Sequence, residues 1–321
     1  ISFLALFRLP ASFFCGFIKT MSQKLPRKAL IPLAGLGTRM FPASKAVRKE
    51  LFPVITPDGR CCSLLQRLLE EAYTAGIEQV GLIIRPGDEG TFSALFDPVE
   101  PAIHQRLSDA AKLEEAALLR MGSKITWLTQ ATQEGFGHAI YCAREWIGEE
   151  AFLLMLSDHI YVTNGDKSCA RQLLDAFQQH GGKSIISLYP VHGEKVRHYG
   201  TGAGTWLDDT RQTLELTRFV EKPELAYARQ HLRMDNLPED TFLCVYGQYV
   251  LTAEIFAILA EQIAANKRHR GEFQLTSALA ELSAKNRLLG FQVDGKHYDT
   301  GQPMAYVRSL AGFAGLLDKQ E

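Results

Sequence analysis

The chain has 321 residues, of which 46% are hydrophobic and 22% charged, and its formal net charge is −1. This composition is typical of a globular protein with one large or two smaller α/β domains, and the absence of a net positive charge argues against nucleic acid as a partner. The six cysteines include no CxxC pair. We therefore expect free thiols in a reducing cytoplasm rather than a disulfide framework or a zinc site.

The first twenty residues are apolar and aromatic, but Arg8 and Pro10 interrupt them. The run is too short to span a bilayer, and no basic segment precedes it as in a secretory signal. Because the stretch from Met21 onward reads as a natural start, we expect residues 1–20 to be an extension that is not part of the native protein, or a poorly ordered tail. A membrane-associating segment is the alternative. No other stretch predicts a membrane span, so we expect no membrane partner.

Short apolar runs alternate with amphipathic stretches along the rest of the chain. The apolar runs predict strands over residues 29–33, 79–84, 125–128, 151–156, 184–189, 214–221, 242–250 and 288–293. The amphipathic stretches predict helices over 63–75, 138–146, 168–180, 253–265, 273–285 and 303–316, with a helical excursion over 102–120. The alternation up to residue 190 is typical of βαβ units, which predicts an α/β fold with a mostly parallel sheet flanked by helices. The later pattern is richer in β-structure.

A glycine-rich segment, Gly-Leu-Gly-Thr-Arg at 35–39, follows the first predicted strand directly. The segment 28–54 also carries five cations: Lys28, Arg39, Lys45, Arg48 and Lys49. Glycines let backbone N–H groups point at a phosphate, so this combination favours a local anion site. The dinucleotide fingerprint fails because Met40 takes its third glycine position, and no GK[ST] follows for a Walker A loop. An ordinary tight turn would explain the glycines but not the cations.

Two motifs here resemble the signature of the sugar-1-phosphate nucleotidylyltransferase family. They are Ala-Gly-Leu-Gly-Thr-Arg-Met-Phe-Pro at 34–42 and Lys-Glu-Leu-Phe-Pro at 49–53. The leucine between the glycines favours the uridylyl branch over the thymidylyl and guanylyl branches, as does Ala-Ser-Lys-Ala at 43–46. The resemblance runs from residue 28 to about 312. It implies a Rossmann-like mixed sheet in one domain over 21–321, with a nucleotide-binding half at 21–190 and a β-rich sugar-binding half at 191–321.

The resemblance also implies a nucleotide site. Gln130 precedes a Gly-x-Gly-His-Ala turn at 135–139, and its amide can donate and accept, which suits the edge of uracil. The glycines there would let the backbone approach the base and ribose, although such turns are common between a strand and a helix. The residues implied to bind the nucleotide are Ala34, Gly35, Gly37, Thr38, Glu50, Gln130, Gly135 and His138.

Two aspartates are candidates for a metal site. Asp158 ends an apolar predicted strand, where open α/β sheets bind ligands, although it could merely cap a following helix. The resemblance implies that Asp158 and Asp299 bind Mg²⁺, for which Mn²⁺ can substitute, and magnesium prefers few carboxylates plus substrate phosphates. His159 and His297 flank the aspartates, and we expect them to be neighbours rather than ligands because histidine is a poor magnesium ligand.

Glu221 and Lys222 follow the predicted strand at 214–221. A salt bridge at the end of a strand would explain an isolated pair. The resemblance implies instead that Glu221 accepts hydrogen bonds from sugar hydroxyls and that Lys222 pairs with the 1-phosphate. The other residues implied to lie against the hexose are Tyr199, Gly200, Glu272 and Gln274. The last two could equally be residues that start a helix.

The reaction implied by the resemblance is UTP plus α-D-glucose 1-phosphate giving UDP-glucose and pyrophosphate. The sugar phosphate attacks the α-phosphorus in line, without a covalent enzyme intermediate. Catalysis would rest on positioning and charge neutralisation. The implied catalytic residues are Arg39, Lys49, Asp158 and Lys222. A homo-oligomer, either a dimer or a tetramer, is also expected.

Two departures from the family pattern leave other interpretations open. Arg48 replaces the proline of the usual K-A-I-P-K-E, and Asp-Gly-Arg at 58–60 replaces a lysine–proline turn. A different base or sugar preference is one alternative. A nucleotide-sugar-binding regulatory subunit without chemistry is another, although the implied phosphate and metal ligands are all present. A dehydrogenase is a weaker interpretation because the dinucleotide fingerprint fails.

Overall fold

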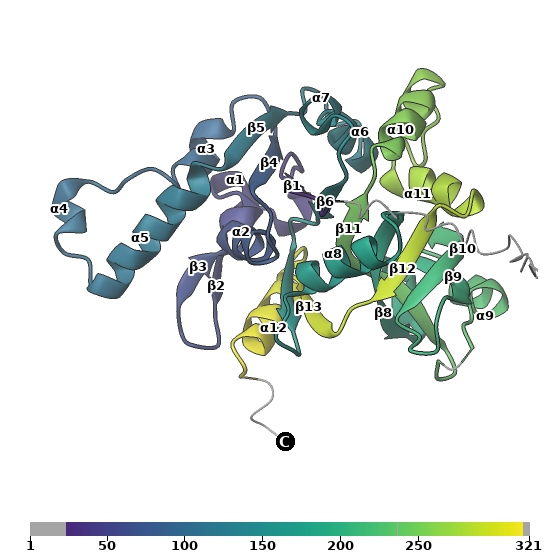
Figure 1. Ribbon diagram of the computed structural model, residues 1–321. Coiled ribbons are helices and arrows are strands. Elements are labelled where there is room, and N and C mark those ends of the chain that lie inside the picture. Colours follow the sequence, from purple (N-terminus) through teal and green to yellow (C-terminus); the bar gives the residue numbers. More distant parts are fainter. Residues whose placement is uncertain (1–23, 236, 317–321) are drawn as a thin grey trace, which may run out of the picture.

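The structure is a computed structural model that describes residues 24–235 and 237–316 (Figure 1). The extension expected over residues 1–20 lies outside the described residues. The main sheet has nine strands, in the spatial order β5 (Ile125–Thr129), β4 (Gln79–Ile84), β1 (Lys28–Pro32), β6 (Phe152–Met155), β11 (Thr241–Leu251), β8 (Ser184–His192), β12 (Leu288–Gln292), β10 (Thr213–Glu221) and β9 (Gly200–Trp206). All eight predicted strands are present, to within three residues at either end.

The directions of these strands confirm a mostly parallel mixed sheet. Strands β5, β4, β1 and β6 are parallel to one another, as are β8 and β12. Strands β11 and β10 pair antiparallel to all their neighbours, so these two run against the other seven. One sheet thus contains strands from both the 21–190 and the 191–321 segments, while their assignment as nucleotide and sugar halves stays a prediction.

Two small antiparallel pairs stand outside the main sheet. Strands β2 (Pro53–Ile55) and β3 (Cys61–Ser63) form a hairpin, and β7 (His159–Thr163) pairs with β13 (Gly295–Asp299). The sequence predicted none of these four strands, nor β9. The four strands of these pairs have only three to five residues each. Strand β7 begins directly after Asp158, where the alternative interpretation placed the start of a helix.

Every predicted helical region contains a helix, but three further short helices, α1, α3 and α9, were not predicted. Their bounds are α1 Ala43–Ala46, α2 Leu64–Thr74, α3 Glu89–Ser93, α4 Pro101–His104, α5 Asp109–Gly122, α6 Phe136–Tyr141, α7 Arg144–Ile147, α8 Cys169–Gln179, α9 Leu225–His231, α10 Glu254–Ala264, α11 Leu275–Ala284 and α12 Pro303–Phe313. Short 3₁₀ turns span Thr38–Met40, Lys49–Leu51 and Gly193–His198. The helix predicted over 138–146 is two helices, α6 and α7, and the excursion over 102–120 is α4 and α5, which project from the body (Figure 1). No described helix combines the length and apolar character needed to cross a membrane.

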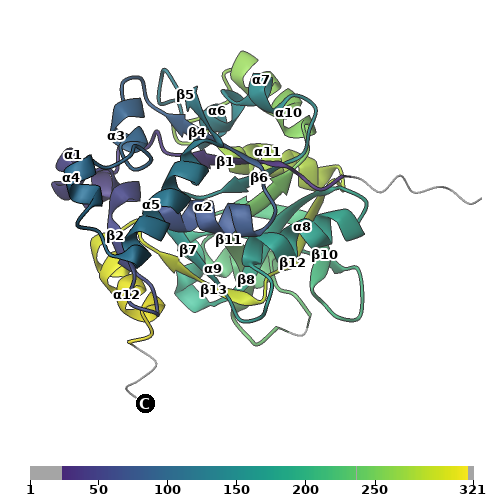
Figure 2. The same ribbon diagram turned by 60° about the vertical axis from the view of Figure 1, so that its left-hand side comes forward.

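The central strands are buried on both faces because helices cover each side. Successive side chains of a strand point to opposite faces, and in β1 the side chain of Leu30 joins one core while Ala29 and Ile31 join the other. The first core contains α6, α10 and α11, and the second contains α2 and α8. Figure 2 looks onto the face covered by α2 and α8. Such two-sided burial explains why these strands read as continuous apolar runs.

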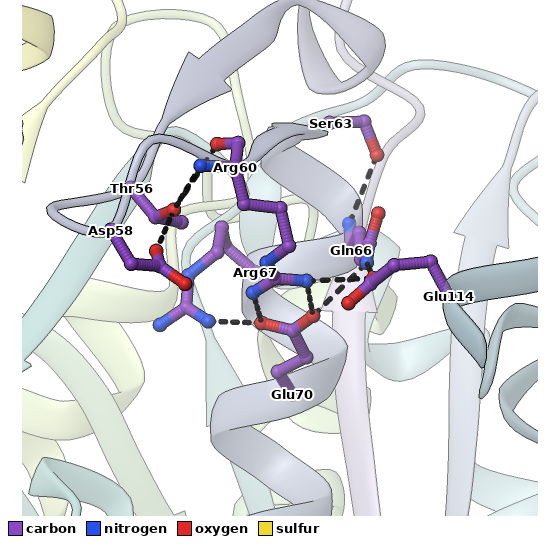
Figure 3. A network of polar contacts seen from close by, with 8 residues as sticks. All are labelled: Thr56, Asp58, Arg60, Ser63, Gln66, Arg67, Glu70 and Glu114. Carbon is purple, nitrogen blue, oxygen red and sulfur yellow. Dashed lines mark hydrogen bonds and ion pairs between the residues drawn. The ribbon is translucent and has the colours of Figure 1, made fainter. Parts of the chain in front are cut away.

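One departure from the family pattern, the Asp-Gly-Arg turn at 58–60, ties the β2–β3 hairpin to the helices (Figure 3). The guanidinium of Arg60 donates to both carboxylate oxygens of Glu70 in α2, at 2.7 and 3.0 Å, and to Glu114 in α5 at 2.9 Å. Gln66 donates to the same two carboxylates, and Arg67 pairs with Glu70 as well. These contacts lower the pKa of Glu70 even though its burial opposes the shift.

We expect Arg60→Ala to lower the free energy of unfolding by about 1–3 kcal/mol, because it leaves partly buried charged acceptors without their donor. Urea denaturation checks this through a lower midpoint at an unchanged slope. Arg27→Ala is the matched control, since Arg27 and Glu78 form an exposed pair of little expected consequence. Equal midpoint shifts in the two variants would show that the network contributes no more than a surface ion pair.

Candidate active site

Two cavities open at the carboxyl ends of β1 and β6. The first, of about 430 Å³, is lined by Ala34, Gly35, Leu36, Thr38, Lys49, Gln130, Gln133, Gly135 and Glu272, among others. The second, of about 360 Å³, is lined by Arg39, Tyr199, Gly200, Glu221, Lys222, Gln274, Thr276 and Asp299, among others. Phe136, Leu156 and Asp158 line both. Asp158 therefore stands where the two cavities meet.

The predicted site residues divide between these cavities almost as their implied roles do. Most residues expected on the nucleotide line the first cavity, and most expected on the sugar line the second. The exceptions are Glu272, which lines the first cavity instead of the second, and Gly37, Glu50 and His138, which line neither. Gln133 and Thr276 are among the lining residues that were missed, although each lies within three positions of a predicted residue, Gln130 or Gln274.

The turn after β1 offers unpaired backbone donors. Gly37 has a left-handed backbone, with φ 64°, and starts the first 3₁₀ turn. Within the described part of the chain, the N–H groups of residues 34–37 have no acceptor. Three of these four residues line the first cavity. Consecutive free N–H groups at such a turn form a concave site for an anion.

The carboxylate of Asp158 is held by cations from the segment after this turn. Its Oδ2 lies 3.2 Å from Nζ of Lys49 and 3.3 Å from Nη2 of Arg39, and its Oδ1 lies 3.2 Å from Nδ1 of His159. Burial alone would raise the pKa of Asp158, but Lys49 and His159 outweigh it and hold that pKa well below its usual value. Burial likewise opposes the charge of Lys49, yet its pKa is raised because Asp158 and Glu50 face it. Both groups are charged at neutral pH.

Strands β7 and β13 bring the two predicted metal ligands together. Asp299 pairs with His159 in their register, and Thr300 donates its N–H and hydroxyl to the carbonyl of Asp158 at 2.8 and 2.9 Å. A methyl group on Gly301 would lie 2.8 Å from Oδ2 of Asp158 and 3.1 Å from Oδ1 of Asp299. These two distances together place the oxygens within about 6 Å of each other. The carboxylates therefore converge, and glycine at 301 keeps the space between them open.

Glu50 lies beneath the first cavity rather than on it. Its side chain is 1% exposed, with Oε1 3.5 Å from Nζ of Lys49 and 3.4 Å from the hydroxyl of Ser157, which donates to it. Burial raises its pKa to about 7, and the charge of Lys49 opposes this rise. The contacts of Glu50 are those of a residue that holds Lys49 in place.

Only two of the five cations in the segment 28–54 line the cavities. Arg48 points to Asp88, with Nη2 2.5 Å from Oδ1, and Lys28 pairs with Glu150 at 2.8 Å. Lys45 is exposed and lines neither cavity. Arg39 and Lys49 alone of the five meet Asp158, so the positive charge at the site is smaller than the sequence suggested.

In the second cavity, Glu221 and Lys222 form the ion pair that the simpler interpretation predicted, with Nζ 3.1 Å from Oε1. They nevertheless line the cavity, and the hydroxyl of Thr276 donates to Oε2 of Glu221 at 2.9 Å. Lys222 has a positive φ of 48°, and its N–H donates to the carbonyl of Tyr199 at 3.1 Å. This local backbone turn keeps both charged side chains at the cavity.

Comparison with known proteins agrees with this geometry. The nucleotidyl transferase family matches residues 28–313, so the chain belongs to that family, which confirms the resemblance. A UTP–glucose-1-phosphate uridylyltransferase of Bacillus subtilis is 32% identical over 302 residues, which cover 93% of this chain and 94% of the relative. Structures of UDP-glucose pyrophosphorylase without ligand and with UDP-glucose, both 28% identical, match with TM-scores of 0.75 and 0.73 and cover 91% of this chain and 99% of theirs.

Proposed function

We propose that this protein transfers a uridylyl group from UTP to α-D-glucose 1-phosphate, giving UDP-glucose and pyrophosphate. The relatives named for this reaction match over nearly their whole length. The observation that carries the proposal is the meeting of the two cavities at Asp158, beside Lys49 and Arg39. A nucleotide in the first cavity and a sugar phosphate in the second would bring their phosphates together there.

The roles of the residues follow from this arrangement. The free N–H groups of residues 34–37 and the ammonium of Lys49 bind the phosphates of UTP, and Gln130 faces the base. Glu221 binds the hexose, and Lys222 orients its phosphate for in-line attack. Since reactants held in place react without further loss of freedom, and fixed cations neutralise charge that grows on the leaving pyrophosphate, no nucleophilic side chain is needed.

The carboxylates of Asp158 and Asp299 fit a magnesium ion. They offer hard oxygen ligands less than about 6 Å apart at the junction of the cavities. No group of three or more His, Cys, Asp or Glu in the described residues could hold a metal by itself, which agrees with a cation that takes its remaining ligands from phosphates and water. When bound, Mg²⁺ or Mn²⁺ would neutralise phosphate charge.

We also propose that the protein works in the cytoplasm. Five cysteines of the described residues are free thiols, which supports a reducing cytoplasm. The homo-oligomer implied by the resemblance stays a prediction. So does the sugar preference, although neither Arg48 nor the 58–60 turn, the two departures from the family pattern, lines the two cavities.

Release of pyrophosphate tests the proposal when each of UTP, dTTP, CTP, ATP and GTP is paired with a panel of sugar 1-phosphates. We expect UTP with glucose 1-phosphate to give the highest kcat/KM, and EDTA to abolish it. Preference for another pair would support a divergent transferase. Tight binding of UDP-glucose with no turnover of any pair would favour a regulatory subunit without chemistry.

A further inference from the structure

The amide of Gln130 is oriented by its protein neighbours. Its Nε2 lies 3.2 Å from the carbonyl oxygen of Gly135 and 3.2 Å from Nδ1 of His138, and the residue is 4% exposed. A backbone carbonyl can only accept, so the nitrogen of the amide must face it. Its Oε1 has no partner among the described residues, and Gln130 lines the first cavity. The acceptor is thus the part of the amide left for a ligand.

The ring of His138 also favours this orientation of the Gln130 amide. Because Nδ1 faces the donating amide, it accepts, and the ring proton sits on Nε2. That nitrogen lies 3.6 Å from Oε2 of Glu134, whose other oxygen accepts from Nη2 of Arg268 at 2.5 Å. The carboxylate therefore favours the tautomer that the amide requires. His138 does not line either cavity, so its contact with a ligand is indirect.

We propose that His138 is a positioning residue that fixes the Gln130 amide with its carbonyl toward the base. The proposal deepens the proposed function, since it assigns how the first cavity selects its base. Uracil has a ring N–H group that can donate a hydrogen bond to Oε1. The same ring nitrogen in cytosine carries no hydrogen, so its lone pair would face the lone pairs of Oε1. Turning the amide to suit cytosine would set Oε1 against the carbonyl of Gly135 and Nδ1 of His138.

Equilibrium binding of UTP and of CTP, measured by calorimetry without sugar phosphate, tests this directly. His138→Phe keeps a ring but removes the acceptor, so the amide can turn more easily. We expect the ratio of the CTP Kd to the UTP Kd to fall at least about fivefold, the lower end for a lost hydrogen bond to a buried group. His138→Asn retains an acceptor and should recover part of the ratio. Cys142→Ala, whose sulfur lies 4.0 Å from Nε2 of His138, is the control and should leave the ratio unchanged.

A purely structural role for His138 gives a different result. If His138→Phe weakens both nucleotides by the same factor, or changes neither, the positioning role is overturned. Thermal unfolding shows whether His138→Phe is folded. If it is not, His138→Asn should still have a lower ratio of the CTP Kd to the UTP Kd than the wild type, and an unchanged ratio would overturn the positioning role. A wild-type protein that binds UTP over CTP but has no turnover would contradict the proposed function while leaving this inference standing.

Discussion

Replacing Asp158 by asparagine is expected to lower kcat by roughly 10³-fold, the upper end for removing one preorganised electrostatic group. The change keeps the shape of the side chain but removes the charge that meets Lys49 and Arg39 at 3.2 and 3.3 Å. Without it, the two cations lose their anchor, and a magnesium ion would lose one of its two carboxylates. Initial rates of pyrophosphate release at saturating substrates measure the loss.

Two further variants make this result specific. Asp299→Asn should reduce kcat less, because Asp299 forms no ion pair within the described residues and substrate phosphates can supply magnesium ligands. Asp294→Asn, in the loop just before β13, lines neither cavity and should be nearly neutral. An Asp158→Asn protein with most of its activity would contradict the role assigned to the junction of the cavities.

Replacing Arg39 by alanine is expected to lower kcat by roughly 10²-fold or more, because a fixed cation near the leaving pyrophosphate stabilises charge that grows in the transition state. The side chain of Arg39 is 58% exposed, and its Nη2 touches Asp158 from the second cavity. It can therefore reach a phosphate at the junction. Steady-state kinetics over a range of UTP concentrations separate the effect on kcat from that on KM.

Lys45→Ala is the matched control for Arg39→Ala, since Lys45 is an exposed cation of the same segment that lines neither cavity. It should behave like the wild type. If Arg39→Ala instead raises KM for UTP at unchanged kcat, the guanidinium binds substrate and transition state equally. Arg39 would then be a binding residue rather than a catalytic one.

The sequence predicted the central sheet well because its strands are buried on both faces and read as apolar runs. Most of the predicted site residues also line the two cavities, since Gly35, Gln130 and Lys222 lie in local motifs whose order along the chain is that of the family. Such motifs specify turns at strand ends, and parallel strands place those ends at one edge of the sheet. Local pattern was therefore sufficient for these elements.

Contacts between distant segments could not be predicted from the sequence. The pairing of β7 with β13, which brings Asp299 to Asp158, joins residues more than a hundred positions apart through two short strands with weak patterns. The partner of Arg48, Asp88, lies in a separate loop, and Lys28 and Lys45 line neither cavity, so counting charges along the chain assigned three cations too many to the site. His138 was expected on the nucleotide, and only its three-dimensional contacts place it behind Gln130.

A crystal structure with UDP-glucose bound is the most direct test of the central claim, that the two cavities are the nucleotide and sugar sites and meet at Asp158. We predict that the uracil lies in the first cavity beside Gln130, the hexose lies in the second beside Glu221, and the diphosphate crosses between them next to Asp158. A product bound with the hexose in the first cavity, or with its diphosphate away from Asp158, would contradict the account.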